Sequence, residues 1–109
     1  MFTIEDNYMT VVKGDTAIFN LEIENYKLEY GDIVYFTVKE SIDDKEPPVI
    51  RKVVNEFEDG IAKFSLTSDD TNIETGKYYY DIQVSLLDGR VDTVITPSRF
   101  KVIGGVTSE

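Results

Sequence analysis

The chain has 109 residues, which is the usual size of one domain, and its 11 Lys and Arg residues against 21 Asp and Glu residues give a net charge of −10. It contains neither cysteine nor histidine, which excludes disulfides and thiolate chemistry and removes the commonest general base and metal ligand. The acidic charge argues against nucleic acid as a partner, because phosphate backbones would be repelled.

Seven segments are predicted to be β-strands, because β-branched and aromatic residues alternate in them with polar ones. In chain order they are residues 8–12, 16–24, 33–40, 49–55 and 61–66, followed by one strand around Tyr78 and one that begins near Val91. Pro97 interrupts the last strand and predicts a bulge or a change of sheet. The polar residues 67–74 are expected to hold one helical turn capped by Thr67 or Ser68.

Strict alternation also predicts which side chains form the core. One buried face is expected to combine Tyr78, Tyr80, Ile82, Val84 and Leu86 with Phe19, Leu21, Phe36, Val38, Phe64 and Leu66. Short strands at this spacing are typical of a β-sandwich, so the expected fold class is an all-β, immunoglobulin-like antiparallel sandwich of about seven strands. The expected organisation is an N-terminal arm at residues 1–7, the sandwich at residues 8–103 and a flexible tail at residues 104–109.

Two local motifs carry specific predictions. Asp88-Gly89 between the last two strands predicts a two-residue type I′ hairpin turn, which needs positive φ at both positions. Tyr78 follows Glu74-Thr75-Gly76-Lys77 and is interpreted either as a tyrosine corner, whose hydroxyl bonds to backbone upstream, or as a plain core residue.

The surface residues leave several alternatives open. Tyr79 with Tyr26, Tyr30 and Tyr35 forms either an exposed aromatic surface or scattered surface tyrosines, and the second interpretation is favoured. The acidic segments 43–46 and 68–70 offer oxygen ligands for Ca²⁺, but neither has EF-hand spacing, and solvated loops explain both. No metal, cofactor or catalytic residue is therefore predicted. A Ser-His-Asp triad cannot form without histidine, and a small hydrolase with paired carboxylates is the least favoured hypothesis.

Three segments together resemble small immunoglobulin-like modules of tailed bacteriophages and prophages. They are Val12-Lys13-Gly14-Asp15-Thr16, then residues 34–41 (VYFTVKES), then residues 66–71 (LTSDDT) leading into 76–83 (GKYYYDIQ). The likeness is to the N-terminal module of upper baseplate proteins and related tail or fibre-attachment proteins, and it covers nearly the whole chain after residue 8. The resemblance implies a virion structural protein without catalysis, which binds other virion proteins as a homo-oligomer or a repeated copy.

The sequence therefore leads to a functional hypothesis and an alternative. The hypothesis is a structural protein-binding module of a phage or prophage particle, in its tail, baseplate, neck or head decoration, where the short C-terminal tail favours an adaptor role. On this hypothesis the module is assembled in the host cytoplasm, and no signal peptide or membrane helix is expected. The alternative is a carbohydrate-binding sandwich displayed at a surface.

The expected protein interface is the N-terminal edge, with Phe2, Ile4, Tyr8 and Met9 as contact residues, since this segment is too short to make a protected strand. Deleting residues 1–7 is expected to weaken assembly and leave the sandwich folded.

Overall fold

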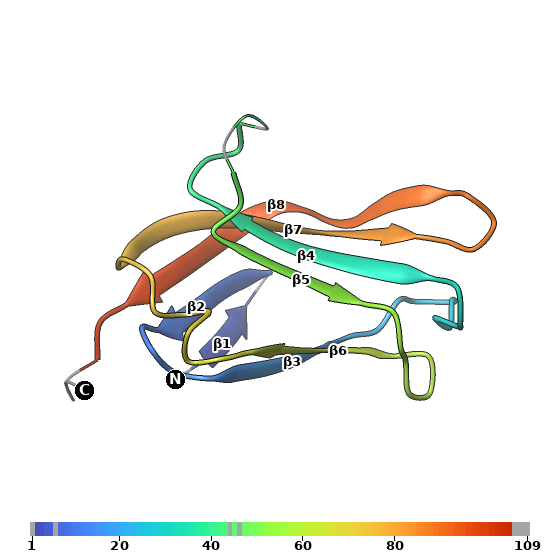
Figure 1. Cartoon of the computed structure of the whole chain (residues 1–109), viewed down its shortest axis with the longest axis horizontal. Coiled ribbons are helices and arrows are strands. Elements are labelled where there is room, and N and C mark those ends of the chain that lie inside the picture. The colour runs from blue at the N-terminus through green and yellow to red at the C-terminus, as the bar shows by residue number, and fades with distance from the viewer. Residues whose placement is uncertain (1, 6, 44, 46, 106–109) are drawn as a thin grey trace.

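The computed structural model describes residues 2–5, 7–43, 45 and 47–105. In this part of the chain all regular structure is β, with eight strands in two facing sheets (Figure 1). No helix long and apolar enough to span a membrane occurs among these residues. The predicted all-β sandwich is confirmed.

The larger sheet has six strands and the smaller one has two. The larger sheet has the order β1 (Phe2–Glu5), β2 (Tyr8–Val12), β8 (Val91–Ile103), β7 (Gly76–Ser85), β4 (Ile33–Lys39) and β5 (Ile50–Val54). The smaller sheet pairs β3 (Ala17–Leu21) with β6 (Ala62–Leu66). The pair β3–β6 facing the run β4–β7–β8 has the arrangement of strands B–E and C–F–G in immunoglobulin-like sandwiches. All neighbours are antiparallel except β2 and β8, which run parallel.

The core lies between the two sheets and follows the predicted alternation. All the residues expected there are buried except Leu86, which is half-buried because it lies where β7 gives way to the hairpin loop. An aromatic cluster forms the centre: the ring of Phe19 lies 5.2 Å from that of Phe36 and 5.1 Å from that of Phe64. Burial of these large rings removes apolar area from water and stabilises the fold.

Two of the predicted polar motifs are present. The Tyr78 hydroxyl donates a hydrogen bond of 2.6 Å to the carbonyl oxygen of Glu74, so the tyrosine corner is confirmed. Thr67 begins the single turn after β6: its hydroxyl accepts from the Asp70 amide, and the Asp70 carboxylate accepts from the Thr67 amide. This reciprocal capping identifies Thr67, and not Ser68, as the cap.

The hairpin between β7 and β8 differs from the predicted type I′ turn. Leu86 and Arg90 are joined by a backbone bond of 2.8 Å, so the loop has three residues, Leu87, Asp88 and Gly89. The Gly89 amide also donates to the Leu86 carbonyl, and only Gly89 has positive φ (96°), whereas Asp88 does not. The loop therefore has the pattern of a type I turn followed by a glycine bulge, in which one residue rather than two takes the left-handed conformation.

The N-terminal segment is the second correction. Residues 2–5, expected as part of an arm, form β1 and pair with β2 in an antiparallel hairpin, which makes eight strands instead of seven. Asn7 has φ of 68° next to this turn. The N-terminal edge expected from the sequence is therefore β1 alone, the first strand in the order of the larger sheet, whereas β2 lies between β1 and β8 and is an interior strand.

Candidate functional site

The first part of β8 is an unpaired backbone edge within the larger sheet. Strand β8 has 13 residues, but β2 pairs only with its end, from Phe100 to Ile103. On the other side, β7 pairs with β8 along nearly its whole length, from Val91 to Val102. Within the described residues, no strand pairs with the outer side of residues 91–99. This free edge of β8 can therefore accept another strand.

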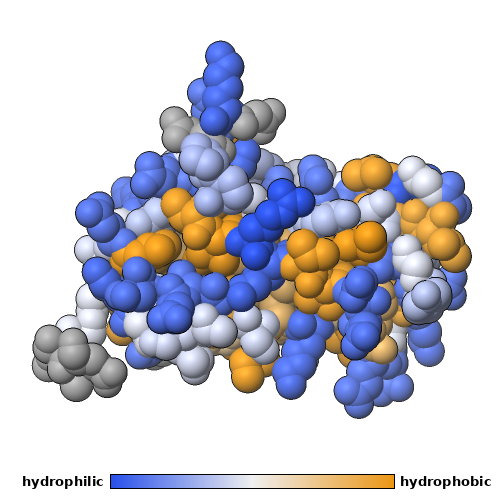
Figure 2. All heavy atoms as spheres, in the orientation of Figure 1, coloured by the Kyte–Doolittle hydropathy of each residue, from blue (hydrophilic) through white to orange (hydrophobic). Residues whose placement is uncertain are grey.

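Side chains along the free edge are exposed and mostly apolar or hydroxylic. Val91 is 64% exposed and Val94 36%, while Ile95 packs partly on the core. Asp92 is the only charged residue between positions 91 and 98, so the edge lacks the lysines that often protect such strands. Figure 2 shows apolar side chains at the end of the molecule where Figure 1 places the β7–β8 hairpin.

Two irregularities divide the free edge. The pairing of β7 with β8 shifts register between Tyr80 and Ile82 and again between Ile82 and Gln83. In both places β8 carries the extra residue, and Pro97 lies in the first of them, so the bulge predicted at Pro97 is confirmed. The regular part available to another strand is consequently the segment from Val91 to Thr93, extended by the bulge at Val94.

The predicted N-terminal contact residues do not form one exposed group. Met9 is 2% exposed and belongs to the core, because its position in β2 faces inward; its assignment as a contact residue is wrong. Tyr8 is 55% exposed on the outer face. The side chains of Phe2 and Ile4 lie outside the described part of the structure, so their role stays a prediction.

The outer face of the larger sheet collects positive charge and tyrosines. The strand register places Lys39 opposite Tyr79 and Tyr79 opposite Arg99. The Arg99 guanidinium lies 5.7 Å from the centre of the Tyr8 ring, and Arg51 lies 5.3 Å from the centre of the Tyr35 ring. Lys77 and Lys101 pair in the next row of the same face. We call this surface, Lys39, Arg51, Lys77, Arg99 and Lys101 with Tyr8, Tyr35 and Tyr79, the cationic face.

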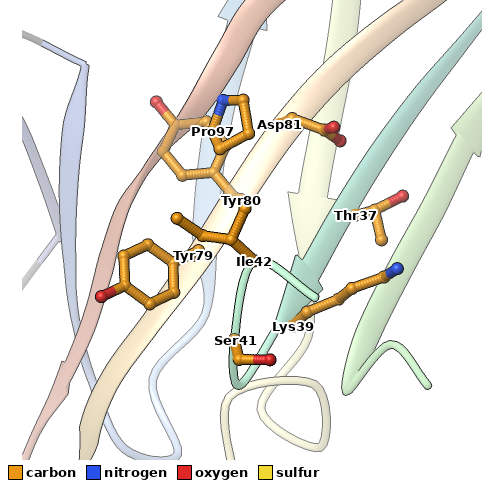
Figure 3. A pocket seen from close by; sticks show the side chains of 8 residues that line it. All are labelled: Thr37, Lys39, Ser41, Ile42, Tyr79, Tyr80, Asp81 and Pro97. Carbon is orange, nitrogen blue, oxygen red and sulfur yellow. The ribbon is translucent and has the colours of Figure 1, made fainter. Parts of the chain in front are cut away.

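A shallow hollow of about 100 Å³ lies on the cationic face beside Pro97. Figure 3 shows the side chains of Ile42, Tyr79 and Pro97 on one side of it and those of Thr37, Lys39 and Ser41 on the other, with Asp81 near Pro97. Tyr80, whose side chain is buried in the core, completes the lining. Pockets for small ligands usually measure about 300–1,000 Å³, so this hollow has room for a single side chain or one sugar ring.

Negative charge gathers where three loops meet at one end of the sandwich. These are the β3–β4, β5–β6 and β7–β8 loops, on the right in Figure 1. They carry the exposed carboxylates of Glu22, Glu24, Glu29, Glu56, Glu58, Asp59 and Asp88. Their cations are Lys27 and Arg90, and Arg90 already pairs with Asp88 at 2.9 Å. We call this surface the acidic end.

Buried Asp32 holds the acidic end in shape. Its carboxylate accepts hydrogen bonds from the Tyr26 hydroxyl (2.7 Å) and from the amides of Glu29 (3.0 Å) and Leu87 (2.9 Å), so it joins two of the loops. Burial alone would raise the pKa of Asp32, but these three hydrogen bonds together hold it below its usual value. The same bond to Asp32 raises the pKa of Tyr26 to about 12, so Tyr26 remains a donor.

The four tyrosines considered together in the sequence lie in different places. Tyr26 and Tyr30 belong to the β3–β4 loop, where Tyr30 is 94% exposed, whereas Tyr35 and Tyr79 lie on the cationic face. A single aromatic surface of all four is therefore not formed. No group of three or more Asp or Glu residues in the described ranges is placed to hold a metal ion; Asp44 and Glu46 of the predicted acidic segment lie outside those ranges.

Sequence reasoning missed both the free edge of β8 and the cationic face. The edge had a signal: the run Val91-Asp92-Thr93-Val94-Ile95 is rich in β-formers and contains no lysine. The cationic face had none, because its residues come from β2, β4, β5, β7 and β8 and meet only through strand pairing.

Comparisons with known proteins give no family. No protein-family model and no curated protein matches the sequence. Among solved structures, the fold is similar to part of a candidate glycoside hydrolase from Bacteroides vulgatus, with 14% sequence identity and a TM-score of 0.48. The match covers 88% of this chain but only 16% of that protein, and at this level of similarity it carries no functional argument.

Proposed function

We propose that this domain is a structural protein-binding module of a phage or prophage particle, which binds another particle protein by strand addition at the free edge of β8. The observation that carries the proposal is this free edge, in which residues 91–99 pair with β7 alone. The assignment to a phage-type particle rests on the turn and strand motifs that the sequence shares with tail modules.

The physical argument for strand addition starts from the unpaired backbone of this edge. In β-augmentation the incoming backbone supplies hydrogen bonds, and alternate side chains supply specificity. Each such bond contributes only about 0.5–1.5 kcal/mol net, so one short edge gives modest affinity. A particle that repeats the module many times raises the total affinity without new kinds of contact. Burial of Val91 and Val94 under a partner strand adds apolar area to the contact.

Incorporation into particles tests the proposal directly. Tagged chain is produced in cells that form the particles, and purified particles are assayed for the tag. We expect the unmodified chain to be present at a fixed ratio to the major particle proteins. The double variant Val91→Lys, Val94→Lys adds charges of the kind that protect natural edges, and we expect it to be incorporated at least tenfold less.

The matched control is Val53→Lys. Val53 is 52% exposed and lies on β5, at the other edge of the same sheet. This variant should enter particles like the unmodified chain, and the thermal unfolding of all variants is measured to verify folding. Absence of the unmodified chain from particles would refute the particle role, and normal incorporation of the double variant would refute the contact at β8.

A carbohydrate-binding module is the second candidate function. The hollow on the cationic face favours it, because it combines an aromatic ring of Tyr79 with the polar groups of Asp81 and Thr37. A panel of oligosaccharides is titrated against the purified chain and against Tyr79→Ala. Micromolar binding that Tyr79→Ala abolishes, together with absence from particles, would replace the structural role by sugar binding.

A further inference from the structure

We infer that copies of this chain associate head to tail, with the cationic face of one copy on the acidic end of the next. The inference rests on the proposed role as a repeated part of a particle, and it names the partner as a second copy of the chain. It uses surfaces other than the free edge of β8, so the two contacts can be tested separately.

The first observation is the unequal distribution of charge. The cationic face holds five of the chain's 11 Lys and Arg residues, although the net charge is −10. Strands β4, β5 and β7, which supply most of this face, contain Asp81 as their single acidic residue. A positive surface on so acidic a molecule attracts acidic protein surfaces and repels other cationic ones.

The second observation concerns the hydrogen bonds within the acidic end. Asp32 joins the β3–β4 loop to the β7–β8 hairpin through the Leu87 amide, and the Leu28 amide donates to the Gly60 carbonyl in the β5–β6 loop at 3.2 Å. The three loops are therefore linked to one another. Their exposed carboxylates are held on one surface before any partner binds, which lowers the entropy cost of association.

The third observation concerns the side chains that would fill the contact. Arg51 and Arg99 lie over the rings of Tyr35 and Tyr8, and tyrosine and arginine are enriched among residues that dominate binding energy. The cationic face thus offers flat apolar area as well as charge. Tyr30, 94% exposed in the β3–β4 loop, gives the acidic end an aromatic side chain of its own.

Symmetry then determines the kind of assembly. Two cationic faces repel each other, and so do two acidic ends, so a two-fold dimer through either surface is disfavoured. A contact between two different surfaces is heterologous and continues from copy to copy, closing into a ring or growing into a filament. The charge pattern therefore predicts a repeated array and not a symmetric pair.

The experiment uses purified chain alone, in sedimentation velocity over a range of concentrations. In about 0.05 M NaCl we expect the unmodified chain to form species larger than a dimer, and in about 0.5 M NaCl to dissociate, because salt screens exposed charges. The face variant is Lys77→Glu with Arg99→Glu, and the end variant is Glu24→Lys with Glu58→Lys. All four residues are exposed, and each variant alone should remain monomeric.

Mixing the two variants is the decisive measurement. The face variant keeps its acidic end and the end variant keeps its cationic face, so an equal mixture should recover association, with one-to-one dimers as the smallest species. The matched control, Lys63→Glu, reverses an exposed charge on β6 outside both surfaces and should assemble like the unmodified chain.

Three results would overturn the inference. The first is an unmodified chain that stays monomeric at every concentration in low salt, and the second is a mixture of the two variants that stays monomeric. The third is that the unmodified chain shows no self-association but binds polygalacturonate, an acidic polysaccharide, and that the face variant loses this binding. None of these results bears on the β8 edge. If the chain self-associates but is absent from particles, the head-to-tail contact stands and the particle role fails.

Discussion

At the scale of single residues, the buried polar groups of this domain act as joints between segments. Tyr78, Asp32 and Thr71 each connect a strand or loop to the backbone of another segment; the Thr71 hydroxyl donates to the Asp15 carbonyl at 2.6 Å. No buried side-chain nitrogen or oxygen among the described residues lacks a hydrogen-bond partner. A buried polar group without a partner is costly, so removing one side of these bonds has a measurable effect.

The tyrosine corner gives the simplest test. Tyr78→Phe removes the hydroxyl that bonds to Glu74 and keeps the buried ring. We expect the free energy of unfolding to fall by about 1 kcal/mol, measured by urea denaturation. Tyr30→Phe, at a position 94% exposed, is the control and should change stability very little.

Asp32 predicts how stability depends on pH. Its pKa is lower in the folded protein than in the unfolded chain, where an aspartate has a pKa of about 3.9. The contribution of Asp32 to the free energy of unfolding is therefore complete above the unfolded pKa of about 3.9 and is lost as the pH falls through the lower folded pKa. Asp70 and Asp88 also have lowered pKa values. At Asp70 burial would raise the pKa, but hydrogen bonds from Lys52 and Thr67 outweigh it, and at Asp88 the largest cause is the hydrogen bond from the Arg90 amide. Both carboxylates therefore add to the loss of stability in acid.

The measurement is urea unfolding between about pH 7 and pH 3, compared with Asp32→Asn and with the exposed-site control Asp69→Asn. Asp32→Asn should be less stable at pH 7 and should lose less stability on acidification. An acid profile for Asp32→Asn that runs parallel to that of the unmodified chain would show that Asp32 does not titrate in this range.

At the scale of elements, alternation in the sequence predicted strands reliably and turns less so. The seven expected strands are present because each buries one face, which period-two patterning reveals directly. Strand β1 was missed because its four residues precede Asp6-Asn7, a pair that tolerates left-handed backbone but that carries no strong turn signal alone. The hairpin type was wrong because Asp-Gly fits both a two-residue turn and the end of a three-residue loop, and the strand register decides between them.

Gly89 tests the corrected turn. Its φ is 96°, and a side chain built there would meet no atom within 4 Å, so any cost comes from backbone strain alone. Gly89→Val is expected to lower stability by about 1–2 kcal/mol, since a β-branched residue resists positive φ. Gly89→Asn, which accepts the left-handed region more readily, should cost clearly less. Equal losses in thermal or urea unfolding would show that the positive φ of this position does not determine the cost.

At the scale of the whole molecule, the sequence predicted the sandwich and its core but not the surfaces. The core follows from residue types that one segment displays by itself, as in Tyr80, Ile82 and Val84. The cationic face and the free edge of β8 depend on which strands become neighbours and how long each pairing runs. No single segment records that information, so only the assembled sheet reveals it.

The N-terminal strand allows a test at this scale. The Tyr80 hydroxyl donates to the Asn7 carbonyl, and burial raises the pKa of Tyr80 to about 12. Removing residues 1–5 deletes β1 but keeps this bond, whereas removing residues 1–7 also deletes its acceptor. We expect both truncated chains to fold, and the longer deletion to cost about 1–3 kcal/mol more.

Tyr80→Phe in each background separates the two effects. It should lower stability in the chain that lacks residues 1–5 and have little effect in the chain that lacks residues 1–7, where the hydroxyl has already lost its acceptor. Equal effects in both backgrounds, measured by urea unfolding, would mean that the hydroxyl finds another partner.

The parallel pairing of β2 with β8 has a mechanical consequence. Phe2 lies beside Val11, and Val11 beside Val102, so the start of the first strand and the end of the last strand lie close together in the same sheet. Tension applied between the two termini would first peel β1 from β2, breaking its bonds one after another. The load would then fall along β2 and β8 in opposite directions and strain their four paired positions together. A force–extension recording should show an early release at low force and a later rupture at higher force, and Pro substitution at Val11 should weaken only the second.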